Sequence, residues 1–356
     1  MASLFLLFGD PENFWPLDFK HIALMKLLGK PLFVHLVEHV ASYVNLRKVV
    51  ILRSKELSGI PSICSPLLPG MDIIEECVDS LRLSDIFEAI NSIKSEDTRI
   101  IVLVAHDLGA TEIDFSKDVC HIVEENGVLK RVILNIGPSK PLNMRLLCSL
   151  NKPLGINPPP TYPWDFLRLF RRLLDVKIKT RIVHPRAEVS DSAKIVGPCW
   201  IGKGAKILEN VVLKGPCYIG ENVLIGNNAL IRESSVERNS IIGANMEVAR
   251  SWLGEKTETH SGYIGDTIFS ERVHVGAGFI TGNVRLDRKT VKVTWGGERI
   301  DTGLEKFGTI IGARTEVGIH SGTMPGVLIG KDVIIGPGTL VFENIPDNTI
   351  IYVEQK

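Results

Sequence analysis

Three short blocks in the second half of the chain hold most of the side chains that could do chemistry, at 260–266, 273–278 and 281–292. The first begins with His260, and a histidine titrates near neutral pH and can take a proton from a reacting group. The last contains Asn283, whose amide could stabilise an oxyanion, and two lysines that could bind a phosphate. Taken singly, these residues could equally be a loop histidine, a turn asparagine and a solvated basic face.

The blocks lie between two stretches that repeat every six residues. Aliphatic residues six apart run from Ile195 to Ile231, and the repeat returns between Ile311 and Val341. Such a period, with small residues at a second fixed place, is typical of the hexapeptide β-helix, in which three hexads close one triangular coil. One coil cannot bury its own apolar face, so coils must stack. The small residues of the first stretch are Cys199, Ala205, Val211, Cys217, Val223 and Ala229.

The first half of the chain has a different pattern. Residues 3–8, 48–52 and 100–105 read as buried strands, and 31–43 and 80–92 read as helices. Strands that alternate with helices predict an α/β fold with a parallel sheet. Ligands of such a sheet are expected at the carboxyl ends of its strands.

These patterns divide the chain into two domains and a connector. The prolines of 157–160 predict a rigid extended segment, and an amphipathic helix follows from Trp164 to Leu174. We therefore expect a shortened Rossmann-like α/β domain over 1–156, a linker and helix over 157–176, and a parallel β-helix over 177–356.

Composition narrows the possible functions. The formal net charge is zero, which argues against a nucleic-acid partner. No apolar stretch reaches the ~18 residues of a membrane helix, and 4–8 lack the preceding basic residues of a signal peptide. The six cysteines show no metal-ligand spacing, so we expect reduced thiols and a soluble, cytoplasmic protein. Cys199 and Cys217 are expected to be neighbours in one interior column.

In order and spacing, the three blocks closely resemble the amino-sugar-1-phosphate acetyltransferase site of the bifunctional uridylyltransferase/acetyltransferases. In that family a His-x-x-Tyr-x-Gly-Asp block precedes Gly-Ala-Gly, an asparagine and lysines, on a left-handed β-helix. The resemblance implies transfer of an acetyl group from acetyl-CoA to a sugar amine, which must be neutral to attack. It implies that His260 is the general base. It also implies that Asn283 either donates to the oxyanion or positions the amine or the thioester.

The resemblance also implies how the substrates are held, and it requires no metal ion for this step. Lys289 and Lys292, with Arg232, would bind the dianionic sugar phosphate. Tyr263 would hydrogen-bond the phosphate or a ring hydroxyl. The backbone amide of Ala277 would hold the acetyl carbonyl.

Two positions depart from the family pattern, and both bear on the substrate. His274 replaces an asparagine of the family, and Ala249 replaces a lysine that binds sugar phosphate there, with Arg250 next in line. The substrate could therefore be glucosamine-1-phosphate, another amino-sugar phosphate or a nucleotide-linked amino sugar. The coils from 307 to 346 resemble the acyl-CoA-binding part of the family, whose β-helices assemble as trimers, so a homotrimer is expected.

The first domain resembles the sugar-phosphate nucleotidylyltransferases. The loop over 6–17, the segment over 23–32 and the Tyr-Pro-Trp-Asp segment over 162–167 are similar to theirs. Asp107 falls where their aspartate holds a divalent metal, so the resemblance implies a magnesium site there only if this domain is active.

The departures from that family fall where it binds a triphosphate. Its opening loop is rich in glycine and carries an arginine, because backbone amides and a guanidinium hold the phosphates. Here Pro11 removes an amide donor, Asn13 replaces the arginine, and His21-Ile22 replaces a Pro-Lys pair. We therefore expect that nucleotidylyltransferase activity has been lost.

The sequence thus predicts an acetyl-CoA-dependent N-acetyltransferase that acts on an amino-sugar phosphate. Two alternatives stay open. One is a bifunctional enzyme that also makes a UDP- or dTDP-sugar, which would need nucleoside triphosphate and magnesium. The other is a non-catalytic trimeric assembly or regulatory protein.

Overall fold

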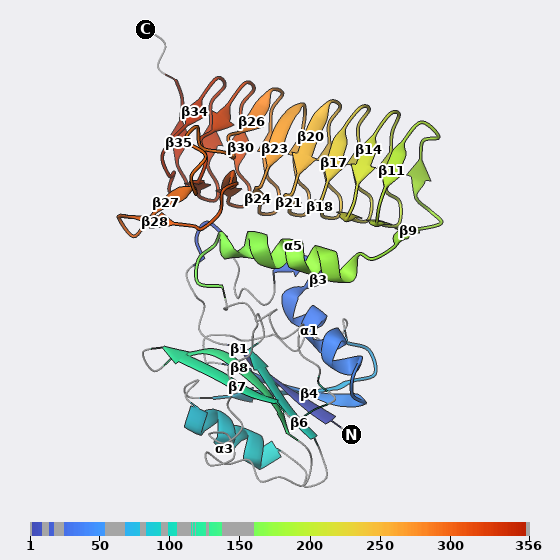
Figure 1. Cartoon of the computed structure of the whole chain (residues 1–356), viewed down its shortest axis with the longest axis vertical. Coiled ribbons are helices and arrows are strands. Elements are labelled where there is room, and N and C mark those ends of the chain that lie inside the picture. Colours follow the sequence, from blue (N-terminus) through green and yellow to red (C-terminus); the bar gives the residue numbers. More distant parts are fainter. Residues whose placement is uncertain are drawn as a thin grey trace. The chain divides into compact units, whose positions relative to one another are not determined.

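The computed structural model of the chain describes residues 2–8, 14–17, 25–53, 68–78, 83–93, 99–104, 115, 117, 119–125, 128–136 and 160–353 (Figure 1). The chain folds into two compact units. The first comprises 1–13, 19–26 and 30–160, and the second comprises 14–18, 27–29 and 161–356. The second unit includes the helix after Thr161 that we placed in a linker, together with two short N-terminal segments. In the described part of the chain, no helix has the length and apolarity needed to cross a membrane.

The first unit is built on one six-stranded sheet with the strand order β5-β4-β1-β6-β8-β7. The expected strands and helices are present, with boundaries shifted by a few residues. The elements are β1 (Ala2–Phe8), β2 (Lys26–Leu27), β3 (Lys30–Pro31), α1 (Leu32–Ala41), β4 (Leu46–Arg53), β5 (Asp72–Cys77), α3 (Leu83–Ile93), β6 (Arg99–Val104), β7 (Val119–Glu125) and β8 (Val128–Ile136).

The sheet is not parallel throughout, and this corrects the expectation. β1 is parallel to β4 and β6, and β4 is parallel to β5, but β8 runs antiparallel to β6 and β7. The short connection between Glu125 and Val128 accounts for the antiparallel pair of β7 and β8, because so few residues can join only antiparallel neighbours. Buried side chains from β1, β4 and α3, including Phe5, Val50 and Ile86, form one core on this sheet.

The second unit contains a parallel β-helix with three faces, so the expected fold class of a Rossmann-like domain followed by a parallel β-helix is confirmed. The first face contains β10 (Glu188–Val189), β13 (Lys206–Ile207), β16 (Leu224–Ile225), β19 (Ile241–Ile242), β22 (Glu258–Thr259), β25 (His274–Val275), β30 (Glu316–Val317), β33 (Ile334–Ile335) and β35 (Ile350–Ile351).

The other two faces have eight strands each. The second face contains β11 (Lys194–Val196), β14 (Val212–Lys214), β17 (Leu230–Arg232), β20 (Met246–Ala249), β23 (Gly262–Gly265), β26 (Phe279–Thr281), β31 (Gly322–Thr323) and β34 (Leu340–Val341). The third face contains β9 (Arg181–Val183), β12 (Cys199–Ile201), β15 (Cys217–Ile219), β18 (Ser235–Val236), β21 (Trp252–Leu253), β24 (Ile268–Phe269), β29 (Thr309–Ile311) and β32 (Val327–Ile329).

The interior of the β-helix contains the aliphatic and small residues of the hexapeptide pattern. From Cys199 to Ile231 they are all buried in one continuous cluster. Cys199 and Cys217 pair in register on the third face and are free thiols, as expected for neighbours in an interior column.

The six-residue period loosens after Val236 because the coils become shorter, and the β-helix itself continues. At the corner between the second and third faces, a hydroxyl accepts the backbone N–H of the next coil. The offset is 17 residues from Ser234 to Ser251, 16 from Ser251 to Thr267 and 42 from Thr267 to Thr309. Each hydroxyl thus satisfies a backbone N–H at this corner. The last offset contains an excursion that leaves the β-helix between 282 and 308.

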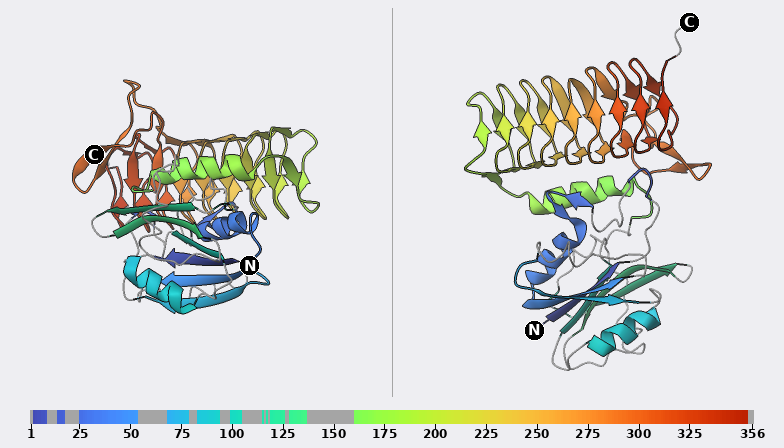
Figure 2. Two further views of the ribbon diagram at one scale, coloured as in Figure 1. Left: turned by 60° about the horizontal axis from the view of Figure 1, so that its bottom comes forward. Right: turned by 180° about the vertical axis from the view of Figure 1, so that it is seen from behind.

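Helix α5 (Asp165–Lys177) lies along the third face, beside β18, β21 and β24 in Figure 1, and Figure 2 shows this helix and the β-helix from two further sides. Its apolar side, with Phe166, Phe170 and Leu173, is buried. Outward-facing residues of the third face, such as Trp252 and Ile268, are also buried. The helix therefore covers a face that would otherwise expose apolar side chains to water.

The excursion forms an antiparallel hairpin of β27 (Lys292–Trp295) and β28 (Glu298–Asp301). The residues at the start of α5 hold it in place. The rings of Trp164 and Trp295 are 6.0 Å apart, and Arg168 donates to the backbone oxygen of Thr302 at 2.6 Å. Because Lys292 lies on β27, its position depends on these contacts.

Candidate functional site

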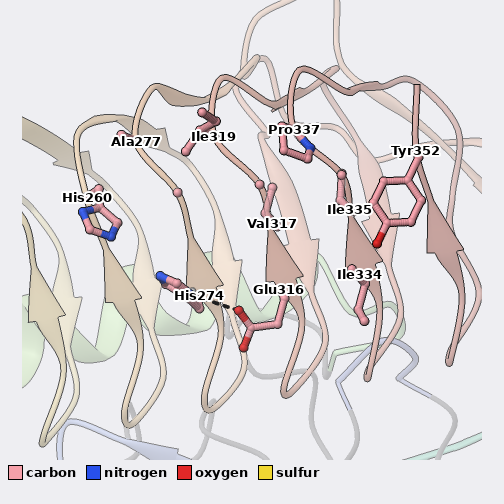
Figure 3. A pocket seen from close by; sticks show the side chains of 13 residues that line it. His260, His274, Ala277, Glu316, Val317, Ile319, Ile334, Ile335, Pro337 and Tyr352 are labelled. Atoms are coloured by element: carbon pink, nitrogen blue, oxygen red, sulfur yellow. Dashed lines mark hydrogen bonds and ion pairs between the residues drawn. The ribbon is translucent and has the colours of Figure 1, made fainter. Parts of the chain in front are cut away.

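A pocket of about 410 Å³ opens where the first face turns toward the second. His260, His274 and Ala277 line its start, and Ile319 and Tyr352 lie further along (Figure 3). His260 directly follows β22, and Ala277 is in the turn between β25 and β26. The local fold thus brings together three of the side chains or amides that the sequence singled out.

His274 is held by a carboxylate that the sequence analysis missed. His274 and Glu316 are register neighbours on β25 and β30, and Nδ1 of His274 lies 2.8 Å from Oε2 of Glu316. A carboxylate only accepts hydrogen bonds when ionised, so Nδ1 of His274 is the donor in this contact. The ring of His274 is 5.9 Å from that of His260. Glu316 follows the excursion in the sequence. The six-residue period gives no information about the length of that excursion, so it could not predict this contact.

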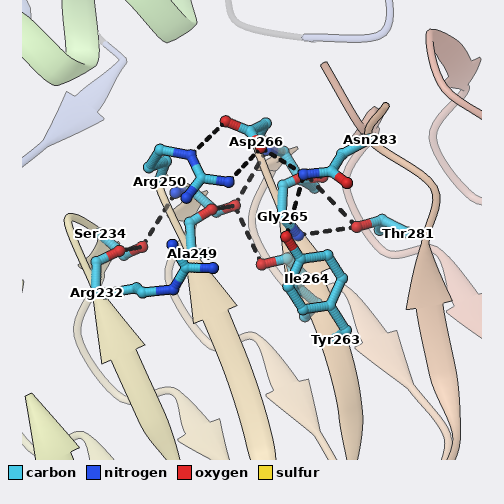
Figure 4. Close-up of polar contacts among 12 residues, drawn as sticks. Arg232, Ser234, Ala249, Arg250, Tyr263, Ile264, Gly265, Asp266, Thr281 and Asn283 are labelled. Carbon is cyan, nitrogen blue, oxygen red and sulfur yellow. Dashed lines mark hydrogen bonds and ion pairs between the residues drawn. The ribbon is translucent and has the colours of Figure 1, made fainter. Parts of the chain in front are cut away.

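A second polar group gathers around Asp266, at the corner where β23 ends (Figure 4). The Asp266 side chain is 0% exposed. Its carboxylate accepts from Nε and NH2 of Arg250 at 2.8 and 2.7 Å, from Arg171 of α5 at 2.5 Å, and from Nδ2 of Asn283 at 2.5 Å. Nδ2 of Asn283 also donates to the hydroxyl of Tyr263 at 3.1 Å. We call these five residues the Asp266 cluster.

Charge balance explains why this carboxylate can be buried. A buried ion needs a partner and hydrogen bonds to offset its loss of hydration. The hydrogen bonds from Arg250 to Asp266 raise the pKa of the Arg250 guanidinium. Burial lowers the pKa of Arg171, and Asp266 opposes this effect. Arg250 follows Ala249, the residue that stands where the family has a phosphate-binding lysine, and it is thus bound to a carboxylate of its own chain.

Arg232 is also paired within the chain. Its Nε and NH2 donate to Oε1 of Glu247 at 2.9 and 2.6 Å, across neighbouring strands of the second face. Either Arg232 or Arg250 would therefore have to exchange a carboxylate for a phosphate before it could bind substrate.

The two lysines lie apart from both groups of residues. Lys289 and Lys292 are exposed on the excursion. Within the described part of the chain, neither lines the pocket or belongs to the Asp266 cluster. The alternative interpretation of Asn283 was a turn residue in the left-handed conformation, and Asn283 does not adopt that conformation. Arg288 does, with φ of 60°.

Several residues that bear on triphosphate and metal binding have no described position. Pro11, Asn13, His21-Ile22 and the candidate metal ligand Asp107 all lie outside the described residues.

Comparison with known proteins gives a family match within the second unit and relatives over half of the chain or more. The family model of the GMPPB C-terminal domain matches residues 177–300. A bifunctional protein GlmU of Methanocaldococcus jannaschii is 37% identical over 53% of this chain and 46% of its own length. A bifunctional sugar-1-phosphate nucleotidylyltransferase/acetyltransferase of Sulfurisphaera tokodaii is 36% identical over 51% of this chain and 45% of its own length. These two matches span about half of each relative.

A third relative aligns from end to end at lower identity. A bifunctional protein GlmU of Methanococcus maripaludis is 24% identical over 99% of this chain and 97% of its own length. Among solved structures, the UDP-N-acetylglucosamine acyltransferase of Francisella novicida matches 44% of this chain and 67% of its own, with 18% identity and a TM-score of 0.23.

Proposed function

We propose that this chain belongs to the bifunctional sugar-1-phosphate nucleotidylyltransferase/acetyltransferase family and is an acetyl-CoA-dependent N-acetyltransferase that acts on an amino-sugar phosphate. The observation that carries the proposal is the pocket that unites His260, His274 and the Ala277 turn at one corner of the β-helix. The relatives named as acetyltransferases support the same reaction class.

The proposed step moves one proton and one acyl group. The neutral amine of the sugar attacks the thioester carbonyl, and His260 takes a proton from the nitrogen as the C–N bond forms. The backbone N–H of Ala277 donates to the carbonyl oxygen, where negative charge develops. The C–S bond then breaks, and the thiolate of coenzyme A leaves and accepts the proton from the imidazolium. The products are an amide and a free thiol.

Asn283 fits one of its two expected roles better than the other. Its Nδ2 hydrogens point to Asp266 and Tyr263, so Oδ1 is the atom that can face a substrate. An amide oxygen accepts hydrogen bonds, which suits the positioning of an amine or a sugar hydroxyl. Stabilisation of the oxyanion would need a donor there, and so we assign that role to the Ala277 amide alone.

The sugar phosphate requires cations, and we assign Lys289 and Lys292 to it, with Tyr263 as a hydrogen-bond donor. His274 would contact the sugar beside His260. Arg232 and Arg250 remain secondary candidates because each is already paired with a carboxylate. In a homotrimer the lysines of one subunit could approach the pocket of the next, which would explain their separation within a single chain. The trimer is part of the proposal.

For the first unit we propose that nucleotidylyltransferase activity has been lost, because Pro11, Asn13 and Ile22 stand where amide and cationic phosphate ligands are needed. A bifunctional enzyme is the second candidate. The end-to-end match to a protein named bifunctional favours it. Binding of a nucleoside triphosphate with magnesium would decide between these two.

The test is release of coenzyme A thiol from acetyl-CoA across a panel of amino-sugar phosphates and nucleotide-linked amino sugars. We expect one sugar class to give release, and we expect His260→Ala to lower kcat by about 10²- to 10⁴-fold, the usual contribution of a general base. His184→Ala, at the first coil, is the matched control and should retain activity. Absence of release with every sugar, or equal rates for His260→Ala and wild type, would favour the assembly protein.

A further inference from the structure

We infer that Asp266 is a positioning residue of this acetyltransferase site: its carboxylate orients the Asn283 amide so that Oδ1 faces the substrate, and Arg171 brings helix α5 into the site as part of its support. The inference rests on the proposed function, because it assigns Asn283 the task of holding the substrate. None of the family resemblances described above gives Asp266 or Arg171 a role.

The orientation of the amide follows from the chemistry of its neighbour. A carboxylate flanked by two guanidinium groups is ionised and can only accept hydrogen bonds. The group of Asn283 that lies 2.5 Å from Asp266 must therefore be the NH2 group. The hydroxyl of Tyr263 accepts the second hydrogen at 3.1 Å. Figure 4 shows the amide oxygen on the side away from Asp266. Asp266 thus sets which end of the amide is presented outward.

The carboxylate needs more than one cation to be held in this way. Each of its oxygens accepts two hydrogen bonds, and three of these four come from Arg250 and Arg171. Arg250 occupies the preceding coil at the same corner, whereas Arg171 comes from a helix 95 residues earlier in the sequence. Nε of Arg171 is buried without a hydrogen-bond partner among the described residues. A buried donor without a partner is destabilising, so the contact between Arg171 and Asp266 is kept at a local cost.

Helix α5 is therefore a part of the site as well as a cover for the third face. Its apolar side packs on that face, and Arg171 extends to the corner with the second face. A β-helix without this helix would leave the Asp266 carboxylate with one guanidinium fewer and open to water.

The test exchanges the carboxylate and the amide between positions 266 and 283. In Asp266→Asn, a single amide oxygen is left to accept the hydrogen bonds that the two carboxylate oxygens of Asp266 accept in the wild type. Its new NH2 group faces Asn283, so the Asn283 amide turns over and presents its NH2 outward. We expect kcat to fall by about 10- to 100-fold, with KM for acetyl-CoA unchanged, as for a misoriented substrate contact. Adding Asn283→Asp restores an acceptor that faces the substrate, and kcat should recover at least tenfold over the single variant.

Asp332→Asn is the matched control. Asp332 forms the same bidentate pair with Arg314 at another corner, with both contacts at 2.7 Å, and neither residue lines the pocket. This variant should retain the wild-type kcat. If Asp266→Asn behaves like the control, or if Asn283→Asp fails to rescue it, the positioning role is refuted.

A second measurement needs no substrate, so it separates this inference from the proposed function. In the wild-type background Asn283→Asp sets two carboxylates against each other and should lower Tm. In the Asp266→Asn background the same change should leave Tm unchanged or raise it. If thermal unfolding shows this coupling while no sugar is acetylated, the proposed reaction fails and the orientation of Asn283 stands. An equal Tm change in both backgrounds would refute the orientation, whatever the activity.

Discussion

The two best-buried carboxylates of the second unit are compensated in different ways. Asp266 has two guanidinium partners, whereas Glu237 has none among the residues that the structure describes and relies on neutral donors. Its Oε1 accepts the backbone N–H of Leu28 at 2.8 Å and the hydroxyl of Ser235 at 2.7 Å, and Oε2 accepts the N–H of Gly29 at 2.9 Å. Burial raises the pKa of Glu237 to about 7 even though these hydrogen bonds favour the ionised form. An N-terminal segment is thus fastened to the β-helix by a group that titrates near neutral pH.

We predict that this carboxyl makes the protein less stable as the pH rises. Its pKa is about 7 when folded, against 4.5 as the ordinary value, so the folded state binds more protons between these limits. Stability must then fall as pH increases through that window, by about 3 kcal/mol in total. Denaturant unfolding at pH 5 and pH 8 measures the difference. Glu237→Gln, which cannot ionise, should lose most of it, and an unchanged pH dependence in this variant would contradict the assignment.

Helix α5 and its N-cap contact three separate parts of the second unit. Three consecutive turns of this helix contribute Trp164, Arg168 and Arg171, which contact the hairpin, its return segment and the Asp266 cluster respectively. The excursion is an insertion between two coils, so the β-helix repeat does not determine its direction. The side chains of α5 supply that constraint, and they link the proposed phosphate ligands to the body of the fold.

We predict that Trp295→Ala weakens binding of the sugar phosphate with little effect on acetyl-CoA. Loss of the ring contacts with Trp164 and Tyr162 frees the strand that carries Lys292. Ordering a mobile side chain costs about 0.5 to 1.5 kcal/mol, which corresponds to a roughly 2- to 13-fold higher KM for the sugar. Steady-state kinetics with each substrate varied in turn tests this. Trp200→Ala, on β12 near the start of the β-helix, should leave both KM values unchanged, and a Trp295→Ala enzyme with normal KM would argue against Lys292.

The second face of the β-helix exposes several large apolar side chains toward its C-terminal end. Leu340 is 57% exposed and Phe342 is 71% exposed, and Ile280 lies on the same outward register of the second face at 54%. Contiguous apolar patches of this kind mark interaction surfaces. A second and third copy of the chain are the partners that the proposed trimer supplies.

We predict that Leu340→Lys separates the trimer, because a charge buried between subunits without a partner is strongly unfavourable. Light scattering should give the mass of three chains for the wild type and of one chain for the variant. Ile182→Lys introduces the same charge on β9, on the third face, and should leave the mass at three chains. A wild-type protein with the mass of one chain would remove the proposed explanation for the distance between the lysines and the pocket.

The hexapeptide period was enough to predict the β-helix, its inward-facing residues and the neighbouring Cys199 and Cys217. It could do so because each coil repeats one local pattern and pairs only with the next coil. The strands and helices of the first unit were likewise readable from local periodicity. The β7–β8 hairpin was missed, since its strands show no clear alternation that separates them from a loop. The blocks from His260 to Lys292 were recognisable because they are nearly continuous in sequence.

Only the tertiary structure decided which partners these residues have. Glu316 reaches His274 across 42 residues, and Arg171 reaches Asp266 across 95. The pairing of Arg232 with Glu247 depends on the register of two coils. Such contacts depend on the length of an excursion, the path of a helix and the shortening of individual corners. A local period carries no information about these quantities, because they are set by how complete elements pack together.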